Sequence, residues 1–520
     1  MTSSRTDKSI RNAKYGLIGQ IFLVIFSFIL RKIFLNTFNN DYLGLGSVFI
    51  TLLNAVNVCE LGLSSAVIFC LYKPLVKDDK ATVAAYMKYM RKAYYIVGAT
   101  VLILGLSLTP FLHIFVRRMP DIENIRLIYA MFVVNSAMTY PLSYRSILLT
   151  ADQRQYAISR YRYFFGCVFH VVQIIVLMLT HNYLLYLSCR LVFNVLENGS
   201  IALKVKHDYP YISQKDVRDL TGAEKRDIKK RVKASALHKL GSFLVFGTES
   251  VFLARLCGVN SATLYQNYFT IQFNLKNFMN IFFSSFSASI GNMYADTKDE
   301  NRKYAVYNIL NFICAWIAGF ASVSLALIYN PFIEIWLGPK YLFNKEAVAL
   351  ISLSFYFFCT RIAMNTTKDA FGLFVYDKYK YIAQFSIYVV LAIIMGRMFR
   401  EAGIFGAMLI ADLATCFWIE PRALFKYGFK KPVSEYFKKY AQHALTAGLG
   451  FILTYILVRL FCTNNSGVIY LVLRVVFCVT VPNIVYALLW CRSAEFRECS
   501  VIVKRVIRRL LVKLRIVKEQ

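Results

Sequence analysis

The chain has few acidic residues and few charges overall. Its 520 residues include 29 Asp and Glu against 61 Lys and Arg, and charged residues make up 17% of it, where a soluble domain carries about a quarter. The hydrophobic content of 58% excludes intrinsic disorder, which requires low hydrophobicity. It also argues against a soluble nucleic-acid-binding protein, although the net charge is +32. The class that remains is a polytopic membrane protein with a basic aqueous face.

Metal-binding and disulfide patterns are missing as well. The 12 Cys residues form no C-x-x-C pair, and the 6 His residues form no H-x-x-x-H or H-E-x-x-H cluster. Most cysteines fall inside apolar runs, where a thiol acts as a small buried hydrophobic group. We therefore expect no metal, no resident cofactor and no bond-breaking chemistry, so the protein is not expected to be an enzyme.

The apolar runs have the length of membrane spans. The first follows a polar basic tail, and at about 20 residues it is too long for the h-region of a signal peptide. The windows that predict spanning helices are 15–36, 44–71, 93–116, 127–149, 161–180, 183–203, 236–256, 262–290, 304–329, 347–367, 381–398, 403–421, 440–461 and 467–490. They predict an all-α polytopic membrane protein with about fourteen transmembrane helices.

Lys and Arg gather on one side of this arrangement. The two termini and the loops on their side of the membrane carry 45 of the 61 basic residues, and the opposite loops carry 7. Cytoplasmic loops carry an excess of Lys and Arg, so we place both termini in the cytoplasm. Most of the excess positive charge therefore indicates how the chain is oriented in the membrane and does not indicate a bound ligand.

Two cytoplasmic segments are strongly basic. The loop 206–235 is open to two interpretations, a solvated linker or an interfacial helix that touches anionic head groups. The C-terminal segment 492–520 places apolar residues at helical spacing between Lys and Arg. This spacing predicts a basic amphipathic helix on the inner leaflet, and a helix that binds a soluble partner is the alternative.

The chain resembles itself at an offset of about 221–225 residues, the clearest match being 110–115 against 331–336. An offset of six helices predicts two pseudo-symmetric six-helix lobes, as in alternating-access transporters, with a cavity between them and two extra helices. The predicted parts are the tail 1–14, the N-lobe 15–205, the basic loop 206–235, the C-lobe 236–428, the extra pair 429–491 and the amphipathic segment 492–520.

Charges inside the predicted spans are costly and normally face a cavity or a partner. Among the basic ones we single out Arg31, Arg145, Arg255 and Arg361 as the lining of a cationic cavity. Arg31 and Arg255 occupy equivalent places in the repeat. Guanidinium groups bind phosphate bidentately, so these residues predict an anionic ligand.

Acids and amides accompany the arginines. Glu60 and Glu249 are candidates for charge partners or for coupling to a proton or sodium ion. Asp412 and Glu420, eight residues apart on one helical face, are weaker candidates for ion coupling. The amides that we expect to line a polar cavity wall, with interhelical hydrogen bonding as the alternative, are Asn54, Asn57, Asn267 and Asn274.

Several strings of residues carry a family resemblance. They are Asp41-Tyr42-Leu43-Gly44-Leu45, Glu60-Leu61-Gly62-Leu63-Ser64-Ser65-Ala66, Leu71-Tyr72-Lys73-Pro74-Leu75, Tyr209-Pro210-Tyr211, His238-Lys239-Leu240-Gly241, Tyr265-Gln266-Asn267-Tyr268 and Ala288-Ser289-Ile290-Gly291-Asn292. Over most of residues 10–380 the chain resembles Wzx-type polysaccharide flippases of the multidrug/oligosaccharidyl-lipid/polysaccharide (MOP) exporter superfamily. Thr248-Glu249 departs from the Thr-Asp of relatives, which leaves the role of that acid open.

The resemblance implies a substrate and partners. Such proteins move an undecaprenyl-pyrophosphate-linked oligosaccharide from the cytoplasmic to the outer leaflet for surface polysaccharide assembly. Membrane lipids, a polysaccharide polymerase and glycosyltransferases would be the partners, and nucleic acid would not. A multidrug cation antiporter of the same superfamily and a lipid II flippase are the nearer alternatives. A membrane-embedded glycosyltransferase or polymerase is the more distant one, and the short outer loops argue against it.

Overall fold

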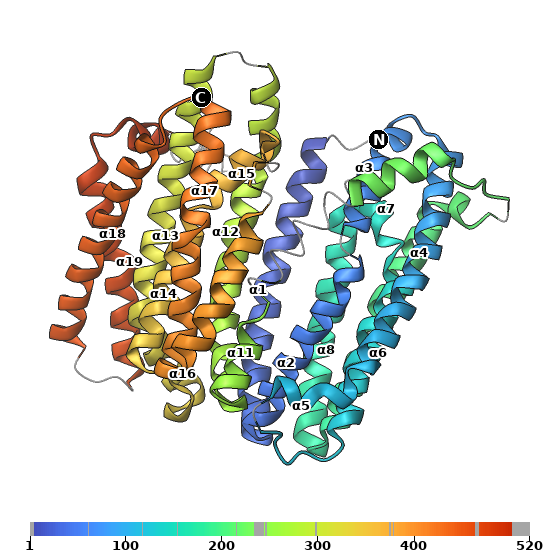
Figure 1. Cartoon of the computed structure of the whole chain (residues 1–520), viewed down its shortest axis with the longest axis horizontal. Helices are drawn as coiled ribbons and strands as arrows, with labels where there is room; N and C mark the ends of the chain where they lie inside the picture. The colour runs from blue at the N-terminus through green and yellow to red at the C-terminus, as the bar shows by residue number, and fades with distance from the viewer. Residues whose placement is uncertain are drawn as a thin grey trace, which may run out of the picture. The chain divides into compact units, whose positions relative to one another are not determined.

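All regular structure in the described part of the chain is helical (Figure 1). The computed structural model describes residues 5–60, 62–116, 118–152, 154–214, 216–232, 244, 247–296, 299–373, 376–377, 379–462 and 467–501. The chain divides into two compact units, Met1–Gln266 and Asn267–Gln520. The boundary falls inside a helix, and the predicted lobe boundaries therefore stay a prediction.

The first unit is built from helices that pack in sequence-distant pairs. Its helices are α1 (Arg5–Thr37), α2 (Asn40–Val56), α3 (Leu63–Val76), α4 (Lys80–Ser107), α5 (Leu112–Phe115), α6 (Ile125–Ser143), α7 (Ser146–Ala151), α8 (Gln155–Thr180), α9 (Tyr183–Asp208), α11 (Glu249–Leu256) and the first residues of α12 (Val259–Asp296). Helix α1 packs along α8, α4 along α6, and α9 against both α6 and α8. The pair α4 and α6 is visible side by side in Figure 1.

The second unit contains the remaining long helices. They are the rest of α12, α13 (Glu300–Leu337), α14 (Lys345–Cys359), α15 (Ile362–Ala370), α16 (Lys380–Ala414), α17 (Cys416–Ala423), a π-helical turn (Leu424–Phe429), α18 (Ser434–Phe461) and α19 (Val468–Trp490). Helices α18 and α19, the predicted extra pair, pack against each other and against α13 (Figure 1). Tyr486 of α19 is fully buried there and donates hydrogen bonds toward the carbonyls of Ala315 and His443, each at 3.2 Å.

Each of the predicted windows contains helix in the described residues. Among the residues that the structure describes, eight helical segments are long and apolar enough to cross a membrane: Gly19–Thr37, Lys80–Phe115, Gln155–Thr180, Glu300–Leu337, Lys345–Ala370, Lys380–Phe429, Ser434–Phe461 and Val468–Trp490. The chain is therefore an all-helical, multi-pass membrane protein. The total of fourteen crossings stays a prediction, and most of the segment 492–520 and the string 238–241 lie outside the described residues.

One predicted span is two shorter helices. The window 44–71 is interrupted between α2 and α3 by a 3-10 turn, Asn57–Glu60. Gly62, at the start of α3, has a φ of 87°, a left-handed conformation that glycine adopts without a Cβ penalty. The break places Glu60 in the turn rather than inside a continuous helix.

The two halves of the chain break equivalent helices at an arginine. Helix α6 ends before Tyr144-Arg145, and α7 continues after it. Helix α14 ends before Thr360-Arg361, and α15 continues after it. Both breaks fall in the fourth predicted helix of their half of the chain, and the internal duplication itself stays a prediction.

Helix α16 folds back sharply near its middle. Arg400 has a non-helical backbone, with φ 53° and ψ −129°, and separates two helical stretches. The return stretch begins with Gly403, whose missing Cβ would lie 2.0 Å from the carbonyl oxygen of Met395. The close approach of these two backbones therefore requires glycine at position 403.

Replacing Gly403 by Ala should destabilise the protein by roughly 1–3 kcal/mol, because the added methyl meets backbone that cannot rotate away. The matched control is Gly448→Ala in α18, where the added Cβ would have no neighbour within 4 Å. That substitution should be neutral or stabilise the helix slightly. Thermal unfolding midpoints of the purified variants measure the difference. Equal midpoints would contradict the close approach.

The basic loop after α9 is folded rather than solvated. Leu220 and Ile228 are 5% and 1% exposed and belong to a hydrophobic cluster that includes Leu71 and Met90. Residues 222–232 are helical, and Figure 1 shows this short green helix near α3. The solvated-linker interpretation is therefore wrong for this part of the loop, because its apolar residues are part of the core of the first unit.

Candidate functional site

The first unit contains an open cavity of about 340 Å³. Helices α1, α2, α6, α8 and α9 contribute its walls, and Gln266 of α12 completes them. The lining residues are Ser27, Leu30, Arg31, Phe34, Tyr42, Leu43, Gly46, Ser47, Ile50, Phe132, Phe169, His170, Gln173, Tyr183, Tyr186, Leu187, Arg190 and Gln266. All of them belong to Met1–Gln266, so the cavity is a property of this unit alone.

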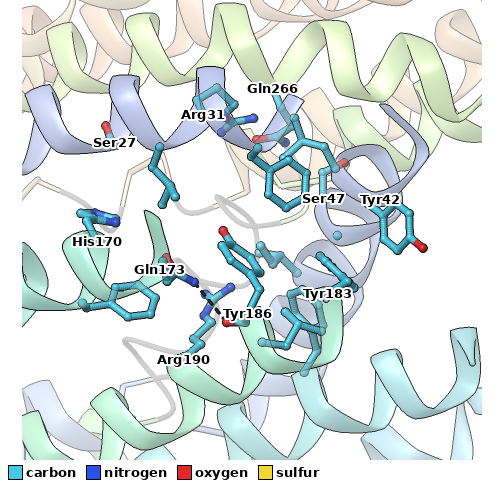
Figure 2. Close-up of a pocket in the computed structure, with 18 residues that line it drawn as sticks. Ser27, Arg31, Tyr42, Ser47, His170, Gln173, Tyr183, Tyr186, Arg190 and Gln266 are labelled. Atoms are coloured by element: carbon cyan, nitrogen blue, oxygen red, sulfur yellow. Dashed lines mark hydrogen bonds between the residues drawn. The ribbon is translucent and has the colours of Figure 1, made fainter. Parts of the chain in front are cut away.

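Two guanidinium groups dominate the charge of the cavity. Figure 2 shows Arg31 of α1 and Arg190 of α9 on opposite walls. The guanidinium carbon of Arg190 lies 5.6 Å from the ring centre of Phe132, a cation–π contact that orients it. No Asp or Glu is among the lining residues that the structure describes. The cavity can therefore neutralise an anion, and it holds no carboxylate for a cation.

Tyrosines form one wall of the cavity. The rings of Tyr183 and Tyr186 stack with their centres 5.8 Å apart at an interplanar angle of 18°. The ring of Tyr42 lies 4.6 Å from that of Tyr183. The buried Gln173 donates a hydrogen bond of 3.3 Å to the carbonyl of Tyr186, which ties α8 to α9 beside this wall (Figure 2). The arrangement offers flat apolar faces with polar edges next to two cations.

Of the four predicted arginines, Arg31 lines this cavity. Arg145 lies at the break between α6 and α7, where it donates hydrogen bonds to the hydroxyl of Tyr144 at 3.2 Å and the carbonyl of Ala202 at 3.4 Å. Arg255 is exposed on α11. Neither Arg145 nor Arg255 is among the residues that line the cavity, and their predicted role in ligand binding stays untested.

The predicted acids bond to hydroxyl groups. Glu60 accepts hydrogen bonds from Ser64 and from the hydroxyl of Tyr94, the latter at 2.9 Å. Glu249 accepts one from the hydroxyl of Tyr265. These contacts hold the carboxylates in place. The predicted ion-coupling role of either acid stays untested.

The predicted amides are dispersed. Asn54 is exposed on α2, and Asn57 accepts a hydrogen bond of 3.1 Å from Ser136. Asn267 is buried, and Asn274 donates to the carbonyl of Thr270 at 2.8 Å, both in the second unit. None of the four lines the cavity of the first unit. Their predicted place in a cavity wall stays a prediction.

Arg361 belongs to a buried network of charges in the second unit. Its guanidinium donates to both carboxylate oxygens of Asp412 at 2.7 Å and to Glu420 at 3.0 Å. Lys380 joins Glu420 to Asp377 with two contacts of 2.7 Å. The side chains of these residues are between 0% and 12% exposed.

Lys368 completes the network through an ion pair with Asp377. Three cations and three carboxylates therefore balance in the described contacts. The guanidinium of Arg361 is paired with two carboxylates. Its burial inside a predicted span therefore requires no external anion. The sequence interpretation missed Lys368, Asp377 and Lys380 because it placed them in a polar loop between helices.

Arg190 is the second arginine of the cavity, and the sequence interpretation did not single it out. It was among the charges inside the predicted spans, but no repeat partner or motif distinguished it. The tyrosine wall also gave no signal, because Tyr183 and Tyr186 are three apart on one helical face and lie far from Tyr42 in the sequence.

The sequence itself matches no protein-family model and no curated protein. The fold, in contrast, is similar to solved membrane transporters. The structure of the lipid II flippase MurJ in an inward closed conformation superposes with a TM-score of 0.64 at 12% identity, over 91% of this chain and 98% of that one. A MATE family multidrug resistance transporter of the MOP superfamily, inward-facing, gives a TM-score of 0.52 at 13% identity, over 77% of this chain and 94% of that one.

Two further structures share the fold. A mutant of the Vibrio cholerae MATE transporter VcmN gives a TM-score of 0.55 at 12% identity, covering 82% of this chain and 99% of that one. A MOP superfamily transporter from Pyrococcus furiosus, whose reversed binding-pocket polarity suggested a different function, gives 0.51 at 12% identity, covering 83% and 98%. The chain therefore has the fold of MOP superfamily transporters such as MurJ and the MATE proteins.

Proposed function

We propose that this protein is a flippase that moves undecaprenyl-pyrophosphate-linked oligosaccharide across the bacterial cytoplasmic membrane by alternating access. The observation that carries the proposal is the cavity of the first unit, which places Arg31 and Arg190 on facing walls without an acidic residue among its described lining. A pyrophosphate carries the negative charge that such a pair neutralises. Arg binds it through parallel N–H···O contacts.

The fold supports transport by alternating access. MATE family transporters with this fold have been solved in inward-facing and in outward-facing conformations. Transport of a lipid-linked glycan needs binding and release rather than bond cleavage, in keeping with our expectation that the protein is not an enzyme. The proposed place is the inner membrane with both termini in the cytoplasm. There the cargo would pass from glycosyltransferases to a polymerase.

The charge of the cavity argues against a multidrug cation antiporter and is compatible with a lipid II flippase. A multidrug cation antiporter needs an anionic group for its cargo, and the described lining offers none. A lipid II flippase is the second candidate, because the likeness to MurJ spans 91% of this chain whereas the MATE structures compared above span 77% to 82%. Lipid II is itself a polyprenyl-pyrophosphate-linked glycan, so the same cationic cavity would serve it.

Deletion of the gene followed by analysis of lipid-linked intermediates separates these functions. The proposal predicts that one undecaprenyl-pyrophosphate-linked oligosaccharide accumulates on the cytoplasmic side. Accumulation of lipid II with arrested cell-wall synthesis would favour the second candidate. Unchanged intermediates with altered drug sensitivity would contradict both.

The tyrosine wall should bind the sugars that follow the pyrophosphate. Replacing Tyr183 and Tyr186 by Leu removes the flat faces and the hydroxyls but keeps both arginines. We expect flipping of the glycan-bearing lipid in proteoliposomes to fall by about fivefold to 150-fold, since each of the two lost aromatic contacts is worth roughly 0.5–1.5 kcal/mol. Flipping of undecaprenyl pyrophosphate without sugar should change less than twofold. Equal losses for the two lipids would contradict a sugar-binding role.

A further inference from the structure

The helix at residues 222–232 is fixed to the first unit by one of its faces. Ile228 is 1% exposed within the hydrophobic cluster that includes Leu71. The thiol of Cys70 lies 3.7 Å from a carboxylate oxygen of Asp227, and the guanidinium of Arg231 lies 4.0 Å from the ring centre of Phe69. Helix α3 and this helix are therefore packed together, and the opposite face of the helix has a fixed direction.

The acidic residues of the helix are already paired. Glu224 receives two hydrogen bonds from Arg218, at 2.9 and 3.0 Å, which lower the pKa of that carboxyl to about 2. Asp227 accepts a hydrogen bond of 2.9 Å from Arg231, which lowers the pKa of Asp227. Both carboxylates of the helix are therefore paired with an arginine, Glu224 with Arg218 and Asp227 with Arg231.

Four cations are left on the outer face. Lys225, Arg226, Lys229 and Lys230 are all exposed and share one side of the helix at i, i+1, i+4 and i+5. In the described part of the chain no carboxylate lies within ion-pair distance of any of them. Asp219 attracts Lys225 and Asp227 attracts Lys230, but only beyond ion-pair distance. Within the described residues, this exposed face therefore carries four positive charges without a direct ion pair.

Exposed apolar side chains lie on α3, the helix against which residues 222–232 pack. Phe69, Tyr72 and Val76 of α3 are 55%, 44% and 77% exposed, and Phe69 is the ring that Arg231 covers. Aromatic and aliphatic groups beside Lys and Arg are the composition of a membrane–water interface. A soluble acidic protein or a nucleic acid would match the charges but would leave these apolar groups in water.

We propose that the outer face of residues 222–232 docks on the anionic phospholipid head groups of the leaflet, while Phe69, Tyr72 and Val76 contact the acyl boundary beside it. The cations would hold this segment of the first unit at the membrane surface. Each cation close to an anionic leaflet strengthens binding by about fivefold. The inference is independent of the proposed cargo.

Lysine acylation of the full-length protein in nanodiscs tests the docking directly. An uncharged acylating reagent and mass spectrometry report the reactivity of Lys225, Lys229 and Lys230 in phosphatidylcholine and in a mixture with 30% phosphatidylglycerol. We expect their reactivity to fall at least threefold in the anionic nanodiscs. It should recover in 0.5 M salt, which screens charge over a few Å, roughly 4 Å. Unchanged reactivity would overturn the proposal and leave a soluble acidic partner.

Exposed lysines of the second unit are the internal control in the same spectra. Lys426, Lys430 and Lys438 are exposed and should lose much less reactivity. An equal loss at both sets would indicate a general effect of surface potential and overturn a specific docking face. The variant K225Q/R226Q/K229Q/K230Q should fold normally in phosphatidylcholine but lose the rise in thermal midpoint that phosphatidylglycerol gives the wild type. A rise equal to that of the wild type would also overturn the proposal.

Discussion

Replacing both Arg31 and Arg190 by Gln is expected to lower the rate of flipping of undecaprenyl-pyrophosphate-linked oligosaccharide by at least about 100-fold. A hydrogen bond to a charged group contributes about 1.5–3 kcal/mol, and 1.4 kcal/mol is a factor of ten. Losing one such contact at each wall of the cavity therefore lowers the flipping rate by about two to four orders of magnitude. Single variants should lie between the wild type and the double variant. Reconstituted proteoliposomes with a fluorescent cargo measure the rates.

Arg459→Gln is the matched control for the arginine variants. Arg459 is another arginine of a predicted span, on α18, and it donates to the hydroxyl of Tyr455 at 2.9 Å outside the cavity. Its loss should leave flipping within about twofold of the wild type, since no substrate contact is removed. Lys at positions 31 and 190 should restore part of the rate, because Lys keeps the charge but not the bidentate geometry. A double Gln variant that flips at the wild-type rate would contradict the site.

Glu420→Gln should destabilise the second unit by roughly 3–5 kcal/mol. The substitution removes the carboxylate that Lys380 and Arg361 share, so three buried cations face only Asp377 and Asp412. A buried charge without a compensating partner is costly. A loss of this size is a large part of the total stability of a protein, about 5–15 kcal/mol. Folded yield and the midpoint of equilibrium unfolding in detergent measure it.

A double variant distinguishes charge imbalance from lost packing. Lys380→Met with Glu420→Leu removes one cation and one anion together and leaves the pairs Arg361–Asp412 and Lys368–Asp377. It should recover most of the stability that Glu420→Gln loses. Glu495→Gln, which breaks the half-buried pair with Lys439, should cost less than about 1 kcal/mol. Equal losses for Glu420→Gln and Glu495→Gln would contradict a tightly coupled network.

The sequence predicted the helices well because lipid leaves few alternatives. Backbone groups in the bilayer must be satisfied within a segment, so long apolar runs are helices, and charged loops mark their ends. The internal repeat stays a prediction, although each half of the chain breaks its fourth predicted helix at an arginine, Arg145 and Arg361. The window 44–71 was too long because a turn at Asn57–Glu60 followed by Gly62 carries little hydropathy signal.

The site was only partly predictable because it depends on distances between helices. Arg31 could be found from its place in a span, whereas Arg190 faces it across the cavity only after α1 packs along α8 and α8 along α9. Arg361 was found as a charge in a span. Lys380 and Asp377 extend its network beyond Glu420. From the sequence they are loop residues between two predicted spans, and only tertiary folding buries them.

Binding of undecaprenyl pyrophosphate compared with uncharged undecaprenol tests the central claim most directly. Titration of each lipid into the purified wild type and the R31Q/R190Q variant gives four affinities. The account predicts that the wild type prefers the pyrophosphate by at least about 100-fold, since charged contacts at Arg31 and Arg190 each contribute about 1.5–3 kcal/mol, and that the variant loses this preference. Equal affinity of the wild type for the two lipids, or an unchanged preference in the variant, would contradict it.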